Sequence, residues 1–217
     1  NDPSARATWS PSAGYTYEEY AIRGILVNSM DVTLHGLGGL SPTGAMPPEG
    51  IERLEVLKGP SAMLSGVALH GSLGGSINII PKRAPASDLT SIAASFDSNA
   101  LFGAHLDIGR RFGRNDSMGL RLNGLHRSGN TAIDRQSLRL GFLSAGADYN
   151  GGSFRLSADA IYHRRERNAP SWQLAVRPGF NIPEPPRTGS NVQQSWASID
   201  AEDVLGLLPK GTHDPSM

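Results

Sequence analysis

Two carboxylates, Glu52 and Glu55, are the first candidates for acid–base chemistry in this chain. Joint acid–base work needs both groups within reach of the same reacting atoms. Residues 51–58 are expected to form a strand, with Leu54 and Val56 on one face, and a spacing of three on a strand puts two side chains on opposite faces. Glu52 and Glu55 are therefore not a catalytic pair, and we predict no catalytic residue.

Other motifs that carry chemistry are also missing from the sequence. There is no cysteine, which excludes thiolate metal sites and disulfides. The six histidines show no spacing that suits a metal, so we predict no metal site and no cofactor. Residues 36–41 are glycine-rich but lack the dinucleotide-binding pattern, and residues 59–66 lack the closing Gly-Lys-Ser/Thr of a phosphate loop. Nothing in the sequence indicates an enzyme.

The charged residues of this region belong to a compact, turn-rich stretch, residues 50–83. A strand over residues 51–58 is broken by Gly59, after which Pro60 suits the first position of a helical turn that Gly66 can end. Gly74 and Gly75 precede a short apolar strand over residues 76–80. Upstream, residues 20–26 are predicted to form one short strand.

After residue 85 the pattern changes to a regular alternation of apolar and polar residues, which predicts half-buried strands. We expect strands over residues 89–97, 102–110, 118–127, 142–149 and 153–164, and a sixth over 194–200. Leu125 breaks the alternation of its strand. Tight turns at 113–116 and 150–152 alternate with longer connections, except at 97–100. The alternation alone fits a soluble antiparallel sandwich and a transmembrane barrel equally well.

The composition narrows the class of protein. The chain has 217 residues with 20 Lys+Arg and 20 Asp+Glu, and this zero net charge argues against a nucleic-acid partner. The sequence contains no run of about 18 apolar residues, so it predicts no transmembrane helix. Transmembrane barrel strands leave a weaker signal, so their presence stays open at this point.

The order of motifs resembles the plug domain of TonB-dependent outer-membrane receptors, in particular their siderophore-receptor branch. The resemblance rests on Ile22-Arg23-Gly24, on residues 51–61 with Lys58-Gly59-Pro60, on Gly74-Gly75-Ser76-Ile77-Asn78 and on Pro81-Lys82-Arg83. It implies an α+β plug domain over residues 1–85, here called the plug region. Residues 86–217 would then begin an antiparallel transmembrane β-barrel of about 22 strands, which is incomplete in this chain.

The resemblance also implies which residues form a site. In the family, basic residues at the positions of Arg23 and Lys58 pair with acidic residues of the barrel wall, which we expect on later strands. We predict contacts between plug and barrel from Arg23, Glu52, Arg53, Glu55 and Lys58. The plug motif itself comprises Gly24, Gly59, Pro60, Gly66, Gly74, Gly75, Asn78 and Lys82.

A ligand-facing loop is predicted over residues 34–48. Its candidates for ligand contact are His35, Leu37, Leu40 and Met46, with a purely structural loop as the alternative.

The resemblance implies a receptor in the outer membrane of a Gram-negative bacterium that imports ferric siderophores. Its partners would be the siderophore and a TonB-type energy-coupling protein, whose binding box we expect outside these residues. We expect the chain to be part of a longer protein, and not to insert or transport by itself. A receptor for cobalamin, haem or a glycan is the alternative, and a β-rich adhesin domain is another.

Overall fold

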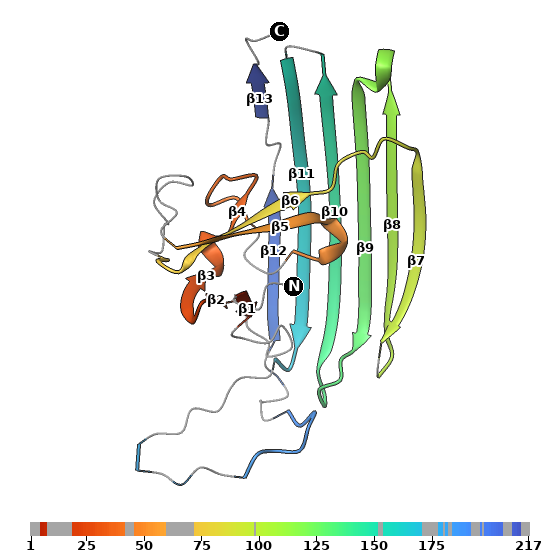
Figure 1. Ribbon diagram of the computed structural model, residues 1–217. Helices are drawn as coiled ribbons and strands as arrows, with labels where there is room; N and C mark the ends of the chain where they lie inside the picture. Colours follow the sequence, from red (N-terminus) through yellow and green to blue (C-terminus); the bar gives the residue numbers. More distant parts are fainter. Residues whose placement is uncertain are drawn as a thin grey trace.

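The computed structural model describes residues 5–7, 19–41, 46–59, 72–97, 99–151, 154–170, 178–179, 181, 184–191, 196, 198–205 and 210–213. Two small sheets form the plug region, and one large sheet follows (Figure 1). The helices among these residues are single 3-10 turns: η2 (Ser29–Asp31), η3 (Pro48–Gly50) and η4 (Arg114–Asp116). None of the described helices is long and apolar enough to cross a membrane.

The first small sheet has the antiparallel order β1-β2-β3, formed by β1 (Ala5–Ala7), β2 (Glu19–Ile22) and β3 (Ile25–Asn28). The single strand predicted over residues 20–26 is therefore wrong. The chain reverses at Arg23 and Gly24, which have φ angles of 53° and 82°. Glycine reaches this left-handed region without strain, and its presence makes the tight hairpin possible.

The second small sheet has the order β4-β6-β5. It contains β4 (Thr33–Leu34), β5 (Ile51–Lys58) and β6 (Gly75–Pro81). The strand predicted over residues 51–58 is confirmed, and the one predicted over 76–80 lies inside β6. The helical turn predicted after Gly59 lies outside the described residues.

The large sheet is antiparallel, in the order β12-β11-β10-β9-β8-β7, and β13 also pairs with β11. The five predicted strands are confirmed, and the last four of them extend further than the alternation indicated. The sixth predicted strand begins at Ser198 instead of residue 194. The strands are β7 (Leu89–Asp97), β8 (Leu101–Phe112), β9 (Met118–Asn130), β10 (Ser137–Asn150), β11 (Phe154–Asn168), β12 (Ser198–Leu205) and β13 (Lys210–His213).

The connections of the large sheet differ between its two ends. The β8–β9 and β10–β11 connections are short and lie at one end, where the chain also enters β7 (Figure 1). The β9–β10 and β11–β12 connections lie at the opposite end and span residues 131–136 and 169–197. The asymmetry rests on residues 169–197, because the β7–β8 connection at the same end is short (98–100) and the β9–β10 connection is one residue longer than the β8–β9 connection. Long loops at one end are typical of outer-membrane barrels, whose short turns are periplasmic and whose long loops are extracellular.

The two faces of the large sheet are the reverse of those in a soluble protein. Its outer face exposes large apolar side chains, among them Ile92 at 79%, Phe102 at 60% and Leu143 at 55%. Its inner face buries polar and charged side chains such as Asp107, Arg121 and Asp159. A soluble sandwich would bury the apolar row, so the arrangement supports a membrane wall with a polar interior.

The plug region packs against this inner face, and β5 and β6 cross the strands of the large sheet (Figure 1). One apolar cluster joins the two parts. It combines plug residues such as Ile22, Leu34 and Met46 with Leu125, Leu140, Phe142 and Ile161 of the large sheet. The cluster explains the break at Leu125, because that side chain faces inward onto the plug region and is 5% exposed.

Candidate functional site

The end of β6 brings two cations to the inner face of the large sheet. Lys82 and Arg83 directly follow Pro81, the last residue of β6. The backbone N–H of Lys82 donates to the carbonyl of Gly50 at 3.2 Å, which fixes the chain as it leaves the small sheet. The two side chains therefore enter the space between the plug region and the large sheet, here called the wall, from a rigid strand end.

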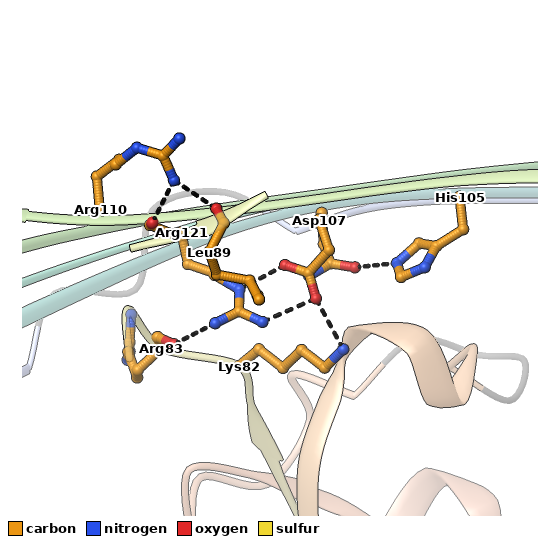
Figure 2. A network of polar contacts seen from close by, with 9 residues as sticks. Lys82, Arg83, Leu89, His105, Asp107, Arg110 and Arg121 are labelled. Atoms are coloured by element: carbon orange, nitrogen blue, oxygen red, sulfur yellow. Dashed lines mark hydrogen bonds and ion pairs between the residues drawn. The ribbon is translucent and has the colours of Figure 1, made fainter. Parts of the chain in front are cut away.

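Asp107 of β8 receives the first of these cations (Figure 2). Its carboxylate accepts hydrogen bonds from Arg121 Nε at 2.5 Å and Arg121 Nη2 at 2.7 Å, a bidentate contact between neighbouring strands. Lys82 Nζ donates to Asp107 Oδ2 at 3.1 Å. Arg121 Nη1 also donates to the carbonyl oxygen of Arg83 at 3.1 Å. One carboxylate thus links two strands of the wall to the plug region.

Asp159 of β11 receives the second cation. Its carboxylate pairs with the Arg83 guanidinium, and His35 Nε2 lies 2.9 Å from Asp159 Oδ2. Arg83 Nη1 donates to the carbonyls of Ala158 at 3.0 Å and Ala147 at 3.3 Å. Arg83 therefore bridges two wall strands while His35, in the turn after β4, reaches the same carboxylate.

A third contact with the opposite polarity lies nearer the long-loop end. Glu49 of η3 accepts from Arg127 of β9, with an N–O distance of 2.5 Å. Here the plug region supplies the acid and the wall supplies the base. The contact therefore uses charges of both signs from both partners.

The burial of these groups makes their pairing necessary. The side chains of Asp107 and Asp159 are 5% and 4% exposed, and that of Arg121 is 8% exposed. A buried charge that loses its partner costs about 3–5 kcal/mol, because it is neither hydrated nor compensated. Lys82 and Arg83 of the plug region thus supply counter-charges to Asp107 and Asp159, which the wall buries.

Two of the predicted contact residues have partners within the plug region. Arg53 and Glu55 pair with each other at 2.8 Å within the plug region. Glu55 also accepts from Asn78 Nδ2 at 2.8 Å. The hydrogen bond from Arg53, then that from Asn78, lowers the pKa of Glu55 below its ordinary value of 4.5. Contacts of Arg23, Glu52 and Lys58 with a barrel wall stay predictions.

The predicted plug motif has a structural role where it is described. Asn78 Oδ1 accepts from Thr33 Oγ1 and from the backbone N–H of Gly36, which ties β4 to β6. Gly75 has a φ of +143°, and a Cβ there would lie 2.0 Å from the Leu57 carbonyl oxygen, so only glycine fits. Gly24, Gly59 and Gly74 are also described, at the turns and close contacts of these sheets. Pro60 and Gly66 lie outside the described residues.

The predicted ligand-facing residues are divided between surface and interior. Leu37 is 50% exposed, whereas Met46 is 5% exposed and packs in the core. Leu40 packs against that core, and His35 contacts Asp159. Ligand contact by these residues stays a prediction, but Met46 and His35 also have structural contacts. No cluster of three or more potential metal ligands occurs in the part of the chain that is described.

Sequence reasoning missed the acids of the plug–wall contact. Asp107 and Asp159, which pair with Lys82 and Arg83, lie on β8 and β11. The acids expected on later strands were partners for Arg23 and Lys58, and that expectation stays a prediction. Two signals were present: both acids lie on the polar side of their strands, and Lys82-Arg83 lies in the short connection between β6 and β7. Alternation gives the face of a residue but not its distant partner.

Comparisons with known proteins agree with this architecture. Residues 1–75 match the TonB-dependent receptor plug domain family. The ferrichrome receptor FcuA of Yersinia enterocolitica is 37% identical over 196 residues, which cover 90% of this chain and 26% of FcuA. This chain thus spans about a quarter of that relative.

Two solved structures show the same fold. BauA, the ferric preacinetobactin receptor of Acinetobacter baumannii, superposes with a TM-score of 0.93 at 34% identity, over 99% of this chain and 32% of BauA. FpvA of Pseudomonas aeruginosa gives a TM-score of 0.78 at 17% identity, over 99% of this chain and 28% of FpvA. The chain thus carries a TonB-dependent receptor plug domain, and most of its length is similar to a ferrichrome receptor and to a ferric preacinetobactin receptor.

Proposed function

We propose that this chain is the plug-bearing part of a receptor that binds ferric siderophores at the outer membrane of a Gram-negative bacterium and imports them. One observation carries the proposal. A plug region is seated by partly buried ion pairs on the polar face of a sheet whose other face is apolar. The siderophore as substrate class is supported by FcuA, a ferrichrome receptor, and by BauA, a ferric preacinetobactin receptor.

The polar contacts between the plug region and the wall suit a plug that moves during transport. Lys82, Arg83 and Glu49 reach the wall with polar groups that water can replace once the contact opens. A fully apolar contact would offer no such replacement and would resist separation. We propose that a TonB-type protein supplies the work that breaks these pairs, and that binding of ligand precedes this step.

The proposal includes no catalytic step and no resident cofactor. Iron enters as cargo inside its chelator, so the protein recognises the organic shell and need not coordinate the metal. A receptor for cobalamin, haem or a glycan would use the same plug and wall, and the choice of substrate is therefore decided by experiment.

Uptake into whole cells tests the proposal. A strain lacking the gene is complemented with the full-length receptor, and radiolabelled iron is supplied as ferrichrome or as other ferric siderophores. We expect accumulation of the label that a protonophore abolishes. Accumulation of labelled cobalamin or haem without any ferric siderophore would overturn the substrate class, and the absence of proton-dependent uptake for all of them would overturn the transport function.

A further inference from the structure

An apolar groove of about 390 Å³ lies in the outer face of the large sheet, close to its short-turn end. Ala147 and Ala158, which are paired across β10 and β11, form its floor. Phe112, Met118, Tyr149 and Leu156 form the rim and are each between 39% and 48% exposed. Small-molecule sites have volumes of about 300–1,000 Å³, so the groove is large enough to hold part of a ligand.

The register of the strands explains the groove. One row across the sheet contains Phe112, Met118, Tyr149 and Leu156, all of them large. In the next row, Leu120 pairs with Ala147, which pairs with Ala158. Two methyl groups beside a row of large side chains leave a depression that is open to the surroundings of the wall.

A cation lies at the end of the same row. Arg110 of β8 pairs with Leu120 of β9, two strands or about 10 Å from Ala147. Its side chain lies on the opposite side of the sheet from Asp107 and Arg121 (Figure 2). It also bonds Thr90 Oγ1 at 2.7 Å, and Thr90 is on the outer face. Arg110 is therefore a charge on the face that carries the apolar rows.

The contacts of Arg110 hold its guanidinium in place and leave part of it available. Nη1 donates to the carbonyls of Leu89 at 2.5 Å and Gly109 at 2.8 Å. With the Thr90 bond these use three of the five N–H donors of an arginine. Nε lies 3.6 Å from Asp88, a distance at which an exposed pair contributes little. The side chain of Arg110 is still 43% exposed.

We propose that this groove and Arg110 bind one phospholipid of the periplasmic leaflet, with an acyl chain over Ala147 and Ala158 and the phosphate on the Arg110 guanidinium. The occupant follows from the position of the groove. The outer face of the wall meets lipid, the short-turn end meets the periplasmic side, and β7 begins at Leu89, beside Arg110. An arginine at this depth suits the phosphate level of a bilayer, and its planar group matches phosphate geometry. The inference rests on the proposed orientation in the outer membrane.

Native mass spectrometry of the full-length receptor tests this proposal, with phosphatidylglycerol added as the probe. Ala147→Leu fills the floor of the groove, and Arg110→Gln removes the cation. We expect each variant to lower the number of lipids retained at a given concentration. For Arg110→Gln the apparent affinity should be about tenfold weaker, as the loss of one charge-assisted contact implies; for Ala147→Leu the loss comes from the filled groove.

Two matched controls are available on the same face of the wall. Ala94→Leu adds the same volume on β7, away from the groove, and Arg139→Gln removes an exposed cation near the long-loop end of β10. Both should retain lipid as the unmodified receptor does. If Ala147→Leu leaves retention unchanged, or if the controls reduce it equally, the proposal is wrong.

Transport on the same variants separates this inference from the proposed function. Normal siderophore uptake together with unchanged lipid retention in Ala147→Leu and Arg110→Gln overturns the lipid site only. If the two variants lose specific lipid retention and the unmodified receptor imports no siderophore, the lipid site is supported and the transport proposal is overturned.

Discussion

Arg83 and Asp159 are 76 residues apart in the chain and form a partly buried ion pair between the plug region and β11. The pair belongs to a set in which acids and bases of the wall are completed by groups from the plug region. The plug region is thus held by a few charged contacts and one shared apolar cluster. Removing a single partner should therefore have a measurable effect.

Replacement of Asp107 by Asn should destabilise the full-length receptor by about 3–5 kcal/mol, because it leaves Arg121 and Lys82 without their counter-charge in a buried site. Chemical unfolding monitored by tryptophan fluorescence measures the loss. Asp88→Asn is the control, since Asp88 is 71% exposed and its replacement should change stability by about 0.5 kcal/mol or less. Equal losses in the two variants would contradict a special role for Asp107.

Replacement of Arg83 by Gln should loosen the plug region more than it weakens the wall. It removes the bonds to Asp159, Ala147 and Ala158, and charged hydrogen bonds contribute about 1.5–3 kcal/mol each. We expect limited proteolysis to cleave the plug region at least about tenfold faster, which is the factor that the loss of a single such bond implies. Arg53→Gln is the matched control, because Arg53 is 63% exposed and pairs inside the plug region. Cleavage at the unmodified rate in Arg83→Gln would refute the seating role.

The family resemblance makes a separate prediction for Arg23 and Lys58. If they pair with acids of the wall, Arg23→Gln and Lys58→Gln should each raise the protease sensitivity of the plug region and alter siderophore uptake. Arg53→Gln again serves as the comparison. Unchanged proteolysis and uptake in both variants would leave the seating of the plug to Lys82 and Arg83.

Replacement of Gly75 by Ala should prevent correct pairing of β5 with β6. The added Cβ would lie 2.0 Å from the Leu57 carbonyl oxygen at a φ of +143°, and backbone cannot move away without breaking the sheet. We expect a loss of more than about 2 kcal/mol in unfolding experiments. Gly38→Ala is the control, because no atom lies within 4 Å of its Cβ position. A well-tolerated Gly75→Ala would show that the sheet edge can adjust.

Glu55 should make the plug region sensitive to acid. Its folded pKa lies below 4.5, so its bonds with Arg53 and Asn78 stabilise the fold above the unfolded pKa and are lost as pH falls through the folded pKa. We expect the unmodified receptor to lose more stability than Glu55→Gln when unfolding is compared at pH 6 and at pH values below 4.5. Parallel pH curves for the two proteins would argue against this contribution.

The sequence predicted local structure better than distant contacts. Alternation located the strand Leu89–Asp97 with the observed bounds, because a half-buried strand needs period two. It also showed which side of each strand is apolar. It could not show that this side is exposed, because a soluble core and a lipid bilayer select the same residues.

Two errors have a clear physical origin. The hairpin at Arg23 was missed because Arg23 itself adopts a φ of 53°, which few non-glycine residues do. Asp107 and Asp159 were not matched to Lys82 and Arg83, because their pairing depends on how the plug region lies across the wall. The shared apolar cluster contributes to that arrangement and includes Leu125, which in the sequence is only a break in the alternation.

The short link between β6 and β7 limits how far the plug region can travel. β6 ends at Pro81 and β7 begins at Leu89, so seven residues join them. Even fully extended, such a link spans about 25 Å. The end of β6 must therefore stay near the wall when every ion pair is broken. In the proposed transport, a path for the solute has to open on a side of the plug region that this connection does not cross.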